Sequence, residues 1–140
     1  TSAPVTTAFY KSIPANVKVI FLWGPRQAFS PTKVAALKQF AAEGGRIVFV
    51  GEIPGTYTGI AVENDLLKQL GVGISVSDIK SEISSIGGAR PVSTTPHQIT
   101  AGVSRLLVNG PQVLNISNSD IALMYDAGNV IIAAGRVDIN

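Results

Sequence analysis

The chain has 140 residues, of which 46% are hydrophobic and only 14% carry a formal charge. This length suits one domain with a proper core, and the charged fraction lies well below the usual quarter or so. The net charge of +2 comes from scattered Lys and Arg residues with few aromatics between them, which argues against nucleic-acid binding. Because cysteine is absent, disulfides, thiolate metal sites and a cysteine nucleophile are excluded.

Location and domain limits are suggested by the same composition. No apolar run approaches the roughly 20 residues of a membrane span, so membrane insertion is not expected. A surface rich in Ser, Thr, Gly and Ala is commoner in exported or surface proteins than in cytosolic enzymes. The chain starts without Met and ends on a strand-like stretch, 132–140, which together suggest a single domain, 1–140, excised from a longer protein.

The first stretch of the chain, 1–15, carries Val5, Phe9 and Ile13 at a spacing near four. This spacing predicts a short amphipathic helix at most. Pro4 is placed to start that helix, and Pro14 to end it.

The next stretch, 17–52, predicts a strand, a helix and a second strand. Ser30 and Pro31 suit the capping and first positions of the helix, and Gly44-Gly45 suits its end. The strands at 17–22 and 47–50 are apolar almost without alternation, as expected when helices cover both faces of a parallel sheet. We therefore predict adjacent parallel strands in a three-layer, flavodoxin-like α/β fold, with a mostly parallel sheet and helices on both faces.

The remaining elements are less regular. Asn64 is a candidate cap for a helix over 65–70, which Gly71 would end, and a short strand follows at 74–76. The last third predicts further strands, which lie at 104–108, 113–116, 121–125 and 130–134. The turn signal at 126–129 makes the last two a hairpin, so we expect antiparallel strands added to the parallel sheet at its C-terminal end.

Several of these stretches together resemble a known family. They are VIFLWGP at 19–25, GRIVFVGE at 45–52, NDLL at 64–67, LG at 70–71 and HQITAGV at 97–103. The pattern resembles class I glutamine amidotransferase-like domains. It is closer to their non-catalytic relatives, the trehalose-utilisation (ThuA-like) proteins and the domain shared by gliding-motility and intraflagellar-transport proteins. The resemblance covers roughly 17–108.

Two departures from that family bear on activity and on the N-terminus. The turn at 51–54, where the family carries its cysteine nucleophile, reads Gly-Glu-Ile-Pro, and the sole histidine, His97, lies in a different context. Glutaminase activity is therefore excluded, since hydrolysis in this family proceeds through a cysteine thiolate. The family also begins with a strand and a helix for which 1–16 is too short.

A ligand site is predicted where the two parallel strands end. In open α/β sheets ligands bind beyond the carboxyl ends of the strands, which here would gather Trp23, Arg26, Glu52 and Tyr57. An aromatic ring, a guanidinium and a carboxylate suit a sugar or a small anion. The structural alternative is that Trp23 packs at the sheet edge, Glu52 pairs with Arg26 and Tyr57 anchors its loop. We weigh this alternative ahead of the ligand site.

His97 is a possible secondary site residue, although a lone histidine more often caps a loop by hydrogen-bonding to the backbone. No catalytic residue, metal site or cofactor is predicted, because no cluster of metal ligands has the required spacing. Three functions remain open. The first is a non-catalytic ligand-binding or protein-interaction module of a larger exported or surface bacterial protein. The second is a carbohydrate-acting or hydrolase-like enzyme using Glu52, and the third is a structural spacer.

Overall fold

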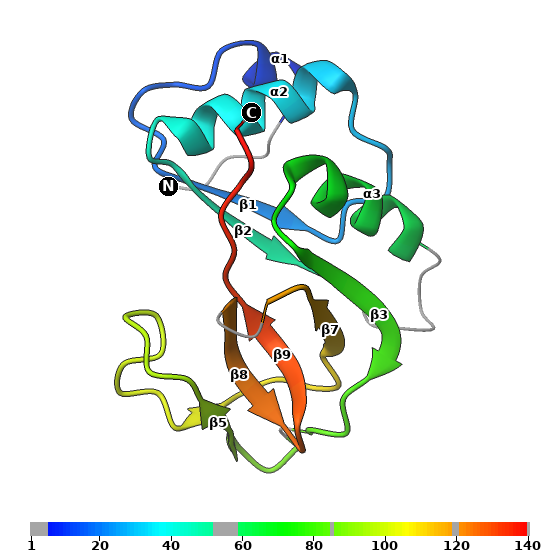
Figure 1. Cartoon of the computed structure of the whole chain (residues 1–140), viewed down its shortest axis with the longest axis vertical. Helices are drawn as coiled ribbons and strands as arrows, with labels where there is room; N and C mark the ends of the chain where they lie inside the picture. Colours follow the sequence, from blue (N-terminus) through cyan, green and yellow to red (C-terminus); the bar gives the residue numbers. More distant parts are fainter. Residues whose placement is uncertain (1–5, 52–58, 85, 119–120, 140) are drawn as a thin grey trace.

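The computed structural model describes residues 6–51, 59–84, 86–118 and 121–139. Figure 1 shows three helices gathered with two parallel strands in one half of the molecule, and small antiparallel sheets in the other half. The helices are α1 (Thr7–Lys11), α2 (Pro31–Ala42) and α3 (Ile60–Leu70). The strands are β1 (Val19–Trp23), β2 (Arg46–Val50), β3 (Ile74–Lys80), β4 (Arg90–Pro91), β5 (Ser93–Thr94), β6 (Arg105–Leu106), β7 (Gln112–Ile116), β8 (Ala122–Asp126) and β9 (Asn129–Ala133).

The β1–α2–β2 unit confirms the prediction of two adjacent parallel strands joined by a helix. β1 and β2 pair in parallel, with Phe21 opposite Val48. The Ser30 hydroxyl accepts a hydrogen bond from the Lys33 amide at 3.3 Å, which caps α2, and Pro31 takes the first helical position. These local signals fix where the crossover helix begins, and its buried stripe fixes which side it turns towards the sheet.

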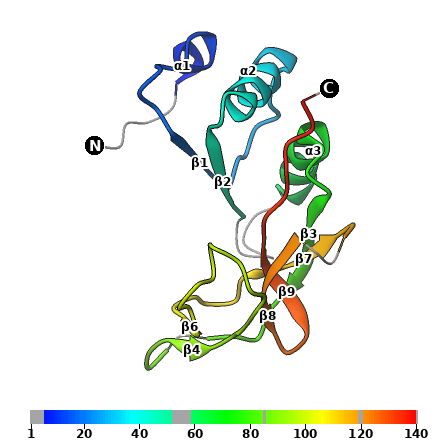
Figure 2. The same cartoon turned by 60° about the vertical axis from the view of Figure 1, so that its left-hand side comes forward.

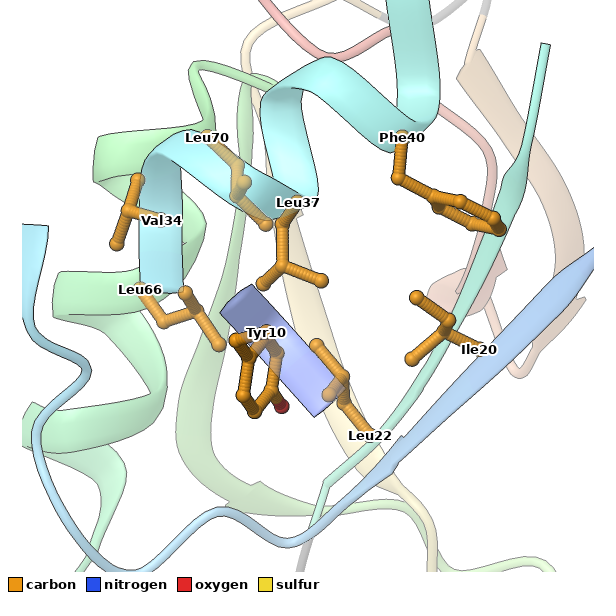
Figure 3. Packing of buried hydrophobic residues seen from close by; sticks show 8 residues of the cluster. All are labelled: Tyr10, Ile20, Leu22, Val34, Leu37, Phe40, Leu66 and Leu70. Carbon is orange, nitrogen blue, oxygen red and sulfur yellow. The ribbon is translucent and has the colours of Figure 1, made fainter. Parts of the chain in front are cut away.

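One hydrophobic cluster joins all three helices to a single face of β1 and β2. Figure 3 shows the side chains from α2 pointing at those of β1, with Tyr10 from α1 below them. Leu37 is completely buried at the centre of the cluster. The eight buried members are Tyr10, Ile20, Leu22, Val34, Leu37, Phe40, Leu66 and Leu70. The parallel pair is thus stabilised from one side, by the burial of apolar surface against α2.

The described residues from β3 onwards form three small antiparallel sheets. β3 pairs with β7, β4 with β6, and β8 lies between β5 and β9. The β8–β9 hairpin turns through Ala127 and Gly128, both at positive φ, which confirms the hairpin predicted around 126–129. After β9 the chain returns to the helical half, where the Asp138 amide donates to the Leu70 carbonyl at 2.8 Å (Figure 2).

The prediction of a three-layer, flavodoxin-like sheet is wrong. Among the residues that the structure places, the parallel sheet has only β1 and β2, and the antiparallel strands form separate sheets instead of extending it. The physical reason is that β1 alternates between buried and exposed positions, although all its residues are apolar. Apolar side chains can also lie on the surface, so an apolar strand sequence does not show that helices cover both faces of the strand.

The predicted role of Asn64 is also wrong. α3 begins four residues earlier, at Ile60, so Asn64 lies inside the helix instead of capping it. Its side chain binds the backbone of Val76 in β3 twice: the amide nitrogen donates to the Val76 carbonyl at 2.9 Å, and the side-chain oxygen accepts from the Val76 N–H at 2.8 Å. The predicted end of this helix is confirmed, because Gly71 adopts the left-handed conformation with φ of 67°.

Replacing Asn64 with Ala should lower the free energy of unfolding by about 1–3 kcal/mol, because the N–H and C=O of Val76 would lose their partner. The exposed neighbour Asp65 offers a matched control, since Asp65→Ala removes only an exposed contact with Gln69. That control should stay within about 0.5 kcal/mol of the parent chain. Urea denaturation measures both changes, and equal effects would contradict the bridging role of Asn64.

Stability should fall at high pH through Tyr10. Burial raises the pKa of this phenol above its ordinary value of 10.0, because the charged phenolate is poorly solvated there. The contribution of the neutral Tyr10 phenol to the free energy of unfolding is therefore complete below pH 10. It is lost as the pH rises through the higher pKa that this phenol has in the folded state. Unfolding free energies measured from pH 8 to 11 should decline less steeply in Tyr10→Phe, and identical slopes would contradict this.

Candidate functional site

The structure places only part of the predicted ligand site. Trp23 ends β1 and is 75% exposed, so the alternative in which it packs at the sheet edge is wrong. Gly24 turns the chain with φ of 47° while its N–H donates to the Val50 carbonyl at 2.7 Å, and Arg26 is exposed beyond it. Glu52 and Tyr57 lie outside the described residues. The four-residue ligand site therefore stays a prediction.

His97 follows β5, and β5 lies in the other half of the molecule from β1 (Figure 1). Its side chain is exposed, and its Nδ1 accepts a hydrogen bond from the Ile99 N–H at 3.1 Å. Its carbonyl accepts another from the Thr100 N–H at 3.1 Å. This is the loop-capping role that the sequence offered as the alternative to a site residue, and it holds the 97–100 turn together.

The side of β1–β2 that faces away from α2 forms a surface that we call the open face. The alternation of β1 sends Ile20 and Leu22 into the core and the residues between them to the other side. The parallel register sets one residue of β2 beside each of these. The open face consists of Val19, Phe21 and Trp23 from β1 with Arg46, Val48 and Val50 from β2.

Exposure of the open face is extensive for a set of apolar side chains. Phe21 is 62% exposed, and its neighbours Val19 and Val48 are 46% and 38% exposed. Scattered exposed hydrophobic residues are normal, whereas contiguous apolar patches mark interaction sites or binding grooves. Because strand pairing makes these side chains direct neighbours, they form a contiguous apolar patch of the kind that marks an interaction site.

The single charge on the open face is at its end. Arg46 begins β2, and its guanidinium donates to the Gly44 carbonyl at 2.9 Å, which holds it beside the end of α2. The face is thus an apolar strip with a fixed positive end, next to Val19. Such a strip can bind an apolar surface and orient it by charge.

Two buried polar side chains lie near the carboxyl end of β2, and the sequence analysis did not single them out. Glu63 of α3 is fully buried, and Gln112 of β7 is 7% exposed. Both approach Gly51, where an added Cβ would collide with the Gln112 side-chain oxygen and lie 3.7 Å from an oxygen of Glu63. Helical spacing could have revealed Glu63, because it precedes the inward-facing Leu66, Leu67 and Leu70 by three, four and seven residues.

Metal-binding clusters and membrane-spanning helices are both absent from the described part of the chain. It holds no group of three or more His, Cys, Asp or Glu side chains arranged to bind a metal ion. None of its helices is long and apolar enough to cross a membrane.

Comparison with known proteins gives a likeness of fold. No family model matches the sequence, and no curated protein matches it either. Among solved structures, the mmIFT52 N-terminal domain aligns with a TM-score of 0.52 and 16% sequence identity. The alignment covers 74% of this chain and 50% of that one, so the chain spans about half the length of this neighbour.

The assignment to the non-catalytic branch of the glutamine amidotransferase-like domains is therefore corrected. No family model supports it, and the two-stranded parallel sheet is not the flavodoxin-like core that it implied. The comparisons also give no support for an extracellular protein. They support a likeness of fold to the mmIFT52 N-terminal domain.

Proposed function

We propose that this chain is a non-catalytic protein-interaction module, and that its open face binds an amphipathic helix of another polypeptide. The observation that carries the proposal is the exposure of Phe21, Trp23, Val19 and Val48 side by side on one sheet face, when the opposite face packs against the helices. Leaving that much contiguous apolar surface in water is unfavourable, and a partner that covers it would gain about 25 cal/mol per Å².

A helix is the element that suits this surface. Parallel strands in proteins are covered by helices on both faces, and α2 already covers the first face of β1–β2. Two strands lie about 4.8 Å apart, so a helix about 10 Å wide spans the pair. A partner stripe with apolar residues at i, i+3, i+4 and i+7 would meet the row formed by Val19, Phe21 and Trp23.

Charge sets the direction of the proposed helix. Arg46 gives the open face its positive end. The partner helix should therefore carry Asp or Glu at the position that lies beside Arg46. The pair would be partly screened by solvent, and its main effect would be on orientation and specificity. The aromatic side chains would contribute most of the affinity, since buried aromatic residues dominate interface energies.

Features elsewhere in the chain also favour binding over catalysis. The ring nitrogen Nδ1 of His97 already accepts the Ile99 N–H, so that atom is engaged in the loop. The enzyme alternative depends on Glu52, which lies outside the described residues. The likeness to the mmIFT52 domain concerns the fold alone and carries no argument about binding.

The test is a selection of displayed helical peptides against the intact chain. Selected peptides should share an apolar stripe and an acidic residue near one end. Their affinity should fall at least 30-fold with Phe21→Glu, as expected for an aromatic hot spot worth about 2 kcal/mol. Arg46→Glu should reverse the preference to basic peptides.

The matched control is Leu107→Glu, because Leu107 is 73% exposed but directly follows β6, outside the β1–β2 sheet. It should leave affinity unchanged, and circular dichroism should confirm that each variant is folded. Peptides without an apolar stripe, or binding that is indifferent to Phe21→Glu, would overturn the proposed function.

A further inference from the structure

The outer edge of β1 has backbone groups without partners among the described residues. The Arg46 N–H donates to the Lys18 carbonyl, and the Gly24 N–H donates to the Val50 carbonyl. Even-numbered residues of β1 therefore turn their backbone groups towards β2, and the odd-numbered residues Val19, Phe21 and Trp23 turn theirs to the other side. No strand that the structure describes lies along that side.

An edge of this kind favours pairing. A two-stranded sheet is marginal alone, and an apolar edge strand with unpaired N–H and C=O groups is a template for another strand. Natural edges are usually protected by Pro, by bulges or by charged side chains. β1 has none of these between Val19 and Trp23, because its sequence is Val-Ile-Phe-Leu-Trp and its pairing with β2 is regular.

We propose that β1 pairs antiparallel with β1 of a second copy of this chain, around a two-fold axis at Phe21. The result would be a four-stranded sheet in the order β2, β1, β1, β2. This inference does not rest on the proposed function, because it concerns the edge of the sheet and not its open face. The two are compatible, since edge pairing would leave the open face uncovered and join two copies of it.

The reason for choosing a second copy is that β1 is complementary to itself. With the axis at Phe21, Phe21 meets Phe21 of the partner subunit, and Val19 meets Trp23 of the partner subunit. Each of the three odd-numbered residues then donates one hydrogen bond and accepts one across the axis. Aromatic pairs and aromatic–β-branched pairs of this kind are favourable across strands.

Charge does not oppose this register. Lys18, the charged residue next to β1, would stand opposite Gly24 of the partner subunit, which is uncharged. Arg46 lies on β2, one strand further from the axis. Isologous pairing of identical surfaces around a two-fold axis is also the commonest route to a protein dimer.

Engineered cysteines test the register directly, because the chain has no cysteine of its own. In Phe21→Cys the two residues would meet with Cα atoms about 5.5 Å apart, which a disulfide can span. The control is Val48→Cys, which is on the same open face but would be three strand spacings, about 14 Å, from its counterpart. Under mild oxidation Phe21→Cys should become a covalent dimer at least 10-fold faster than Val48→Cys.

A second experiment covers the case in which Phe21→Cys fails to fold. Val19→Cys and Trp23→Cys chains, mixed in equal amounts, should form the mixed disulfide in preference to either self-disulfide. Sedimentation of the unaltered chain should show a monomer–dimer equilibrium, shifted at least 10-fold to monomer by Phe21→Pro but less by Phe21→Thr, which keeps the N–H.

The outcomes separate the two proposals. Equal cross-linking of Phe21→Cys and Val48→Cys would indicate association through the open face and overturn edge pairing. A chain that stays monomeric at every concentration would overturn it as well. If such a monomer still binds the selected helical peptides through Phe21, the proposed function stands while this inference fails.

Discussion

The fold depends on one constraint, the burial of a parallel strand pair from a single side. α2 brings Val34, Leu37 and Phe40 against Ile20 and Leu22, and α1 and α3 close the cluster around them. Parallel pairing alternates side chains between two faces, so every residue that packs under α2 has a neighbour facing away from it. The same register that builds the core therefore builds the exposed strip of Val19, Phe21 and Trp23.

Much of the local structure was predictable from the sequence. Ser30, Pro31, the apolar stripe of α2 and the Gly44-Gly45 stop define one helix, and the β-branched runs on either side define its two strands. The hairpin around Ala127 and Gly128 was equally accessible, because its turn residues have a conformational requirement of their own. These signals act within a few residues, where the chemistry of each side chain determines the local backbone conformation.

The larger architecture could not be predicted in the same way. Val-Ile-Phe-Leu-Trp reads identically whether one face or both faces of the strand are covered, so the flavodoxin-like layers did not follow from it. Asn64 was misassigned for a related reason, because its partner, Val76, is twelve residues away and is brought near only by the turn at Gly71. Of the candidate site, Trp23 was expected beside a pocket at the end of the strand, whereas the structure places it on the exposed face of the sheet.

Coverage of β1–β2 on one face only can be measured by nuclear magnetic resonance with a soluble paramagnetic agent. We expect strong relaxation of the Val19 and Val48 methyl groups and of the Phe21 and Trp23 rings, because these side chains meet solvent. The buried Ile20, Leu22 and Leu37 methyl groups should be protected in the same sample. Equal protection of the two sets would contradict one-sided coverage, because it would mean that both faces of the sheet are covered.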